Sequence, residues 1–584
     1  MILQSLHQLY DRLAGSAGYA VAPPGYSLQK ISFAVVIHPD GRLHAIEDRR
    51  EQIGNKYRPR QLLVPGQAKP SGSGINPCFL WDNPFYLFGF TEDSDKSARA
   101  HTACEAFRDR HLALETEIDD PAFSAVCKFL RHWSPEKSRE QPEIAELAGG
   151  FGVFQLLGAT EYVHERPRIR DWWGQQQSST AGSTTGSTTG TCLVTGARLP
   201  IAHIHEPKLK GVPGAQSSGA LLVSFNCDAF ASYGKSQSHN APVSEEAAFR
   251  YATALNAILS GPRSDKHRFQ VGDTTVVFWT ERPTVAEDWL AQVLTGDLEA
   301  QDDTALNQMK VLLQALRNGG GELRSLGDDP DTPVHMLGLA PNAGRLAVRF
   351  WHTGSLGDLF DKLKAHHDAL RIVRQHDSGS KKPDPEFPPI WMLLRQTARE
   401  SKEIPPLLAG NLMRAILDGT PYPDALANAV LRRIRADRTI NYLRAALLKA
   451  WLIRKSHRQG EIPVSLDPHR LEPAYRLGRL FAVLEKTQED AQPGINATIR
   501  ERFYSAASAN PSVAFPRLLR TYQHHLAKLK PGAKVNREKL VQEIVDGLDG
   551  MPAHLNLDDQ ARFAIGYYHQ RKALFTKSEQ EPQE

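Results

Sequence analysis

The apolar positions in the last third of the chain recur at the spacing of amphipathic helices. In residues 439–456, Ile440, Leu443, Leu447 and Trp451 form one apolar stripe, because positions three or four apart share a face of a helix. The same spacing predicts helices at residues 390–400, 405–417, 423–435, 439–456, 475–489, 495–507, 512–528, 537–548 and 557–575. No segment here alternates like a strand, so this part is predicted to be an α-helical bundle.

The preceding part of the chain mixes both periodicities. Residues 31–37 are β-branched and aromatic, a turn signal follows at His38-Pro39-Asp40-Gly41, and residues 42–46 read as the second strand of a hairpin. Further strands are predicted at residues 221–225, 274–279 and 346–351. Helices are predicted near the start and at residues 101–115, 122–133, 245–259, 285–294, 304–317 and 358–375. The fold class is therefore α+β, with a mixed α/β N-terminal region before the bundle.

Two segments lack apolar periodicity. Residues 175–191 (QQQSSTAGSTTGSTTGT) are predicted to form a mobile loop, because Ser, Thr and Gly favour flexible connections. Residues 379–388 are rich in Pro, Gly and Ser and are predicted to be a linker. The expected organisation is a mixed region at residues 1–378 and a helical bundle at residues 389–584.

Composition narrows the class of protein further. The 584 residues carry a formal charge of +4 with 41% hydrophobic residues, which is ordinary globular usage. The five Cys form no C-x-x-C pair, which argues against a zinc ribbon or a disulfide framework and favours a reducing cytosol. The N-terminus does not read as a signal peptide, and no apolar run is long enough to span a membrane. We expect a cytoplasmic protein with no membrane partner.

A local excess of positive charge stands out against the nearly neutral total. Residues 432–458 contain one acid, Asp437, and nine basic residues: Arg432, Arg433, Arg435, Arg438, Arg444, Lys449, Arg454, Lys455 and Arg458. Such an excess favours a polyanion as partner, although a solvated helix face is the ordinary explanation of a charge run.

A glycine-rich loop is the second candidate for contact with nucleic acid. Its relevant residues are Lys69, Ser71, Gly72, Ser73, Gly74 and Asn76. Glycines let a backbone approach a ligand closely, and an Asn amide both donates to and accepts from base edges. A surface loop before an aromatic strand would have the same composition.

No catalytic motif is complete, so we expect neither catalysis nor a metal or other cofactor. Gly234-Lys235-Ser236 lacks the first glycine of a phosphate-binding loop, and a turn explains it. His203, His205 and Glu206 lack a second ligand pair for zinc. His367-Asp368 and His376-Asp377 resemble the dyad of metal-dependent phosphohydrolases, but a solvated helix face and a linker explain them. A metal-dependent nuclease stays open as an alternative.

Several long blocks resemble one known family, the large subunit of the type I-C (Csd-type) CRISPR Cascade surveillance complex. They cover almost the whole chain. The blocks are APPGYSLQKISFAVVI (22–37), RPRQLLVP (58–65), GINPCFLWDNPFYLFG (74–89), PIAHIHEPKLKGVPGAQSSGALLVSFN (200–226), RADRTINYLRAALLKAWLIR (435–454) and RLGRLFAVLEKTQ (476–488).

The resemblance implies a non-catalytic, DNA-binding subunit of an RNA-guided complex. Such a subunit recognises a short protospacer-adjacent motif in double-stranded DNA, supports R-loop formation and recruits the helicase–nuclease. Its implied partners are the crRNA, the subunit that holds the crRNA handle, the backbone subunits and the small subunits. A purely structural subunit without DNA contact is a further alternative.

The resemblance also assigns residues. Lys69, Gly72, Ser73, Gly74 and Asn76 would form the motif-reading loop, with Asn76 on a base edge and Lys69 on phosphate. A second polar segment would either face nucleic acid or pack residues 221–225 into the core; it contains Lys208, Lys210, Gln216, Ser217 and Ser218. The displaced strand would contact Arg432, Arg433, Arg435, Arg438 and Arg444. An internal start at Val464 would yield a small subunit of residues 464–584.

Overall fold

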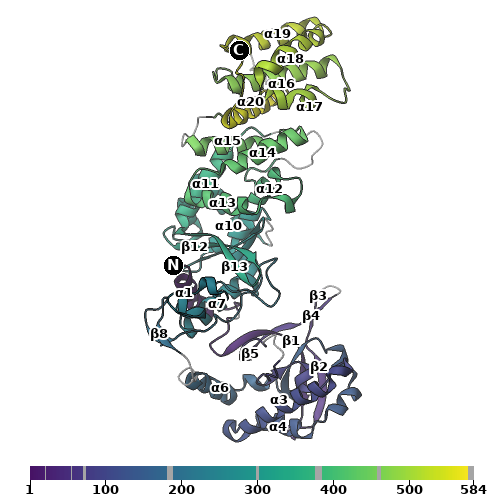
Figure 1. The fold of residues 1–584 in the computed structure, drawn as a ribbon, viewed down its shortest axis with the longest axis vertical. Helices are drawn as coiled ribbons and strands as arrows, with labels where there is room; N and C mark the ends of the chain where they lie inside the picture. Colours follow the sequence, from purple (N-terminus) through teal and green to yellow (C-terminus); the bar gives the residue numbers. More distant parts are fainter. Residues whose placement is uncertain are drawn as a thin grey trace. The chain divides into compact units, whose positions relative to one another are not determined.

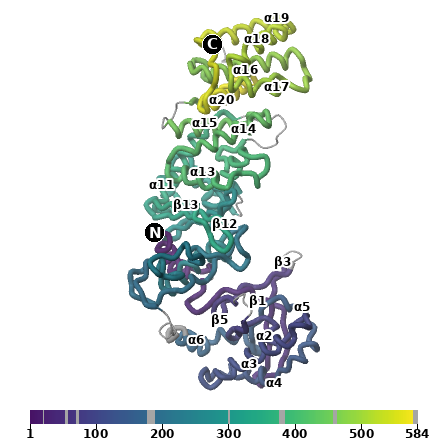
Figure 2. Tube along the Cα trace, viewed as in Figure 1, coloured from purple at the N-terminus to yellow at the C-terminus, as the bar shows by residue number. Residues whose placement is uncertain are grey.

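The computed structural model describes residues 1–19, 21–53, 56–69, 74–180, 188–297, 302–374, 384–456 and 462–575 (Figures 1 and 2). Its contacts divide the chain into two units. Unit 1 consists of Met1–Ser264 with Asn342–Leu346, and unit 2 of Asp265–Pro341 with Ala347–Glu584. The predicted linker at residues 379–388 falls within unit 2, and residues 379–383 lie outside the described part, so the division into residues 1–378 and 389–584 stays a prediction.

Unit 1 is organised around one long strand, β1 (Tyr26–Ile37). It pairs antiparallel with β2 (Leu43–Asp48) and β5 (Arg60–Pro65), and parallel with β7 (Phe151–Leu156). β7 in turn pairs with β6 (Trp81–Asp82), and β3 (Glu51–Ile53) pairs with β4 (Lys56–Arg58). The last seven residues of β1 are buried, which explains their continuous apolar character.

The predicted β1–β2 hairpin is confirmed at its turn. The His38 amide donates to the Arg42 carbonyl at 2.8 Å. Gly41 has φ +89°, and a Cβ there would lie 2.5 Å from the Cβ of Lys128. The position therefore requires glycine for both its backbone conformation and its close contact with a helix.

Helices complete unit 1. They are α1 (Ile2–Ala14), α2 (Pro84–Leu87), α3 (Ser97–Ile118), α4 (Pro121–His132), α5 (Pro142–Glu146), α6 (Pro167–Thr180) and α7 (Glu245–Ser260). α1 and α7 pack together, with Arg250 paired to Asp11 at 3.0 Å. Between α6 and α7 lies the short hairpin of β8 (Thr189–Thr191) and β9 (Arg198–Pro200).

Two predictions in unit 1 need correction. The loop predicted at residues 175–191 is too long, because α6 continues to Thr180 and β8 begins at Thr189; residues 181–187 lie outside the described part. Glu117 of α3 accepts hydrogen bonds from Trp172 at 3.0 Å and Gln176 at 2.7 Å, so tertiary contacts support the longer α6. The strand predicted at residues 221–225 is wrong: only Leu221 pairs, in an isolated bridge to Arg345.

Unit 2 begins with a four-stranded antiparallel sheet. Its order is β10 (Arg268–Val271), β11 (Thr274–Thr280), β12 (Pro333–Asn342) and β13 (Arg345–Ser355). The sheet shares one apolar core with α9 (Val285–Thr295), α10 (Asp303–Asn318) and α11 (Leu356–Leu370). A short helix, α8 (Ser264–His267), precedes the sheet.

After residue 389 the described chain contains helices and no strand, as predicted. They are α12 (Ile390–Leu394), α13 (Pro406–Asp418), α14 (Asp424–Asp437), α15 (Tyr442–Ser456), α16 (Pro473–Ala491), α17 (Ile499–Ala507), α18 (Pro511–Leu526), α19 (Pro531–Asp546) and α20 (Leu557–Phe575). Together with the sheets of the N-terminal region, they confirm the α+β class.

Reciprocal glycines let α16 and α20 cross at very close range. A Cβ on Gly478 would lie 2.1 Å from the Phe563 carbonyl oxygen, and one on Gly566 would lie 2.1 Å from the Tyr475 carbonyl oxygen. No side chain fits at either position without separating the two helices.

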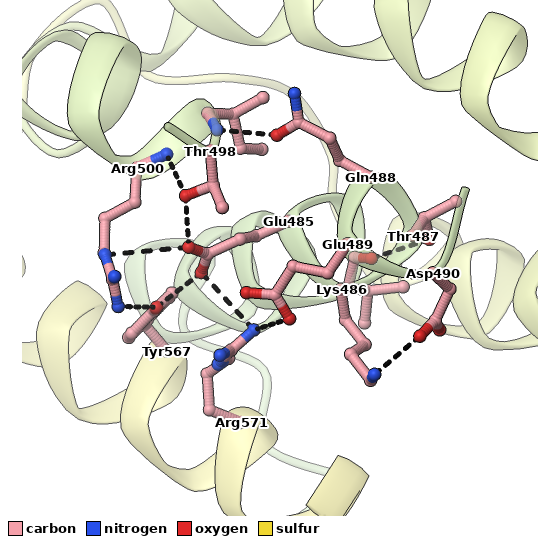
Figure 3. Close-up of polar contacts among 12 residues, drawn as sticks. Glu485, Lys486, Thr487, Gln488, Glu489, Asp490, Thr498, Arg500, Tyr567 and Arg571 are labelled. Carbon is pink, nitrogen blue, oxygen red and sulfur yellow. Dashed lines mark hydrogen bonds and ion pairs between the residues drawn. The ribbon is translucent and has the colours of Figure 1, made fainter. Parts of the chain in front are cut away.

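A buried polar network joins α16, α17 and α20 beside that crossing (Figure 3). Glu485 is fully buried, and its carboxylate lies 3.6 Å from Arg500 and 3.7 Å from Arg571. The hydroxyls of Tyr567 and Thr498 donate to it at 2.5 and 2.7 Å. One carboxylate thus faces two cations from two other helices. Each cation has a second partner as well, because Arg571 pairs with Glu489 at 2.9 Å and Arg500 with Glu501 at 3.4 Å.

Candidate nucleic-acid interface

A cleft of about 1270 Å³ in unit 1 brings together the two predicted recognition segments. Its lining includes residues of β1 together with Lys69 and Asn76. It also includes residues 206–212 and 215–218 and residues of α7. Lys208, Lys210, Gln216, Ser217 and Ser218 all belong to this lining. Residues more than 130 positions apart thus face one cavity.

Lys69 is held by the protein itself. Its ammonium forms an ion pair with Asp82, which is fully buried, and lies 3.1 Å from the ring centroid of Tyr86. Burial lowers the pKa of Lys69 and raises the pKa of Asp82, while the attraction between the two charges opposes both shifts. Only 13% of the Lys69 side chain is exposed. Lys69 therefore anchors the start of the predicted loop to β6.

Asn76 is exposed at the other end of the predicted loop. Its backbone amide donates to the Tyr86 hydroxyl at 3.1 Å, so the ring that covers Lys69 also positions Asn76. Gly74 is exposed as well. Gly72 and Ser73 lie outside the described residues, and their role stays a prediction.

The wall of the cleft that residues 206–218 form combines buried anchors with exposed polar side chains. Leu209 and Ala220 are buried and pair with each other. The side-chain amide of Asn256 on α7 clamps the wall, since it donates to the Lys208 carbonyl at 3.0 Å and accepts from the Lys210 amide at 2.9 Å. Lys210, Gln216, Ser217 and Ser218 are exposed and Lys208 is half-buried. The wall has a packed base and a free polar rim.

The cleft is strongly biased toward positive charge. Its lining includes five basic residues, Lys30, Lys69, Arg110, Lys208 and Lys210, but one acidic residue, Glu206. Within the described part of the chain, Lys30, Lys208 and Lys210 form no ion pair. Such a cleft attracts an anionic ligand along its length.

Sequence reasoning missed three residues of this cleft: Lys30, Arg110 and Asn256. Lys30 is the one exposed residue of β1. A lysine at this position of the strand could have indicated from sequence that this part of β1 is exposed. Arg110 and Asn256 lie on amphipathic helices, and neither carries a local mark that distinguishes it from a solvated residue.

The arginine cluster of residues 432–458 is largely used for internal contacts. Arg433 and Arg444 both pair with Asp437, and Arg444 is buried. Arg435 donates to Gln560 at 2.5 Å. Lys449 is also buried, which lowers its pKa to about 8.

Two members of the cluster remain available. Arg432 and Arg438 are exposed and have no ion-pair partner among the described residues. Arg458 lies outside the described part. The free positive charge in this cluster is therefore much smaller than a count of its basic residues indicates.

Within the described part of the chain, the alternative metal sites are not assembled. His367 is half-buried beside Phe387, and desolvation lowers its pKa to about 4. Asp368 pairs with Lys364 at 2.5 Å. His205 is buried against the Tyr251 hydroxyl at 2.7 Å, whereas His203 is exposed. The described residues contain no group of three metal-ligating side chains, and His376-Asp377 lies outside them.

Comparison with known proteins defines the class. A family model described as CRISPR-associated protein (Cas_Csd1) matches residues 6–575. Because the match spans nearly the whole chain, the protein belongs to this family and is a CRISPR-associated subunit of the Cascade type. The resemblance to the type I-C large subunit is confirmed.

No curated protein matches the chain. None of the helices in the described part is both long and apolar enough to cross a membrane.

Proposed function

We propose that this subunit recognises the protospacer-adjacent motif in duplex DNA with the cleft of unit 1, and that it does so without catalysis. The observation that carries the proposal is the meeting of Asn76 and the Lys208–Ser218 wall in one basic cleft. In an RNA-guided complex the crRNA reads sequence by base pairing, so the protein needs to read only a short motif and the backbone.

The side chains of the cleft suit different parts of a DNA duplex. Asn76, with the rim of Gln216 and Ser217, supplies donors and acceptors suited to base edges. Lys208 and Lys210 supply unpaired cations suited to phosphates. Lys69 acts through Asn76, because its ion pair and its contact with Tyr86 hold the loop in place. This assignment replaces the phosphate contact expected for Lys69.

Replacing Asn76 by alanine tests the motif reading. In a Cascade complex assembled with crRNA, we expect Asn76→Ala to weaken binding to motif-bearing duplex by about 5- to 150-fold, because one good base contact contributes about 1–3 kcal/mol. Binding to duplex with a scrambled motif should change little. Measured dissociation constants for the two duplexes give the discrimination directly.

Asn428→Ala provides the matched control, since Asn428 is an exposed asparagine on α14 of unit 2. Motif discrimination that survives Asn76→Ala unchanged would instead favour a purely structural role for the loop.

The remaining roles extend the same proposal to unit 2. Arg432 and Arg438 would contact the phosphates of the displaced strand without sequence preference, which supports R-loop formation. The complex would then recruit the helicase–nuclease. The crRNA, the handle-binding subunit, the backbone subunits and the small subunits complete the set of proposed partners.

We further propose that Val464 begins an internally initiated small subunit. The helices α16 to α20 all follow this position, and the Glu485 network and the α16–α20 crossing lie entirely within them. We expect mass spectrometry of a complex purified through a C-terminal tag to reveal a second product of residues 464–584. Recovery of the full-length chain alone would contradict internal initiation.

A further inference from the structure

The most exposed aromatic side chain among the described residues lies on a tight turn of unit 1. Tyr233 is 96% exposed. In the turn of residues 232–235, the Lys235 amide donates to the Ser232 carbonyl at 3.0 Å. Both central residues have positive φ, +51° for Tyr233 and +66° for Gly234. A left-handed tyrosine has a conformational cost that glycine or asparagine would largely avoid.

The turn is nevertheless well ordered by one side chain. The amide of Asn240 accepts from the Ser232 backbone at 2.9 Å and donates to the carbonyls of Lys235 at 3.2 Å and Gln237 at 2.9 Å. These bonds fix the backbone on both sides of Tyr233. The phenol ring is thus exposed to solvent on a turn whose backbone is held by hydrogen bonds. It contributes no packing to the part of the chain that the structure describes.

Two links connect this turn to the Lys208–Ser218 wall of the cleft. The Ser238 hydroxyl donates to the His203 carbonyl at 2.9 Å, three residues before Glu206 enters the cleft lining. The Arg345 guanidinium lies 4.7 Å from the ring centroid of Phe230. The carbonyl of the neighbouring Gly344 accepts from the Leu221 amide at 3.0 Å, and Leu221 directly follows the Leu209–Ala220 pair of the wall. The segment that carries the turn is therefore joined to the wall by these contacts within unit 1.

We propose that Tyr233 is a stacking site for an unpaired nucleobase next to the duplex end held in the cleft. This inference rests on the proposed function. Only an unpaired or terminal base offers a free face to an aromatic ring, and stacking of this kind tolerates any base. Lys235 is exposed two residues away and has no ion-pair partner among the described residues, so it suits the adjoining phosphate.

Forked DNA tests the site. The full-length chain is titrated with a motif-bearing duplex that ends in an unpaired arm, with 2-aminopurine at the first unpaired position. We expect stacking to quench its fluorescence with the wild type and with Tyr233→Phe. Tyr233→Asn should abolish the quenching and weaken fork binding by about 5- to 100-fold. Asparagine tolerates the left-handed backbone, so the melting temperature should not fall.

The outcomes separate this inference from the proposed function. Tyr57→Ala, at another exposed tyrosine of unit 1, should leave the quenching intact. Unchanged quenching in Tyr233→Asn, with Asn76→Ala still impairing recognition of a blunt motif duplex, would overturn the stacking site alone. Failure of the wild type to bind either DNA would overturn both. Loss of a Cascade subunit from the Tyr233→Asn complex, with quenching retained, would identify a protein contact and also overturn the stacking site.

Discussion

Replacing Glu485 by alanine is expected to accelerate amide hydrogen exchange in α16, α17 and α20 by about 100-fold or more. The carboxylate is fully buried and lies between Arg500 and Arg571. Its removal leaves Arg500 and Arg571 with their second partners alone, Glu501 at 3.4 Å and Glu489 at 2.9 Å. The cost should therefore lie at the lower end of the about 3–5 kcal/mol of breaking a buried pair. Because each 1.36 kcal/mol is a tenfold change, the effect on local opening is large.

The measurement is hydrogen exchange of the full-length chain, with peptides from unit 1 as an internal reference. Glu485→Gln separates charge from hydrogen bonding, since the single amide oxygen can still accept from one of the two hydroxyls, that of Tyr567 or that of Thr498. We expect it to retain only part of the protection. The matched control is Lys486→Ala on the same helix, whose ion pair with Asp490 is partly exposed, so its loss should cost no more than about 1 kcal/mol. Equal exchange in Glu485→Ala and wild type would show that the network contributes no stability.

The elements that sequence predicted well are those whose signals are local. The turn of His38-Pro39-Asp40-Gly41 is read from four adjacent residues, and Gly41 indeed has the positive φ that the turn requires. The helical stripe of residues 439–456 corresponds to α15, because burial of one apolar face dominates such a segment. The strand predicted at residues 221–225 failed because apolar, β-branched composition alone does not supply a neighbouring strand.

The candidate site was only partly predictable, because the state of a charged side chain depends on tertiary contacts. Lys69 and Arg444 look alike in a count of positive charges, yet each is paired with an acid in the folded chain. The partner of Lys69 lies 13 residues away, and Asp437 serves two arginines at once. Sequence placed Lys210 and Asn76 in separate polar segments, and only the fold shows that they line one cleft.

Reversing the charge of the unpaired lysines is expected to remove most of the cleft's affinity for DNA. In Lys208→Glu with Lys210→Glu, two phosphate contacts are lost. Each contact to duplex DNA contributes about 0.9 to the slope of log K against log salt, so the slope should fall by about 2 and the affinity at 0.1 M salt by about 100-fold. The loss should be similar for motif and scrambled duplex, because phosphates carry no sequence information.

The control must change net charge equally without touching the cleft. Lys96→Glu with Lys402→Glu does so, because each exposed lysine pairs with a neighbouring acid, Asp93 or Glu400. Both double variants lower the formal charge from +4 to 0. A comparable loss of affinity in the control would mean that total charge governs binding. An unchanged affinity in Lys208→Glu with Lys210→Glu would exclude these lysines as phosphate contacts.

The contrast between this variant and Asn76→Ala is the most informative result. If the cleft binds duplex as proposed, the lysine reversals reduce affinity for every sequence and weaken the salt dependence, whereas Asn76→Ala reduces affinity only where the motif is present. Both sets of side chains line the same cavity. Two different signatures from one cleft are expected if its side chains contact different parts of the same duplex, with Lys208 and Lys210 on the backbone and Asn76 on a base edge.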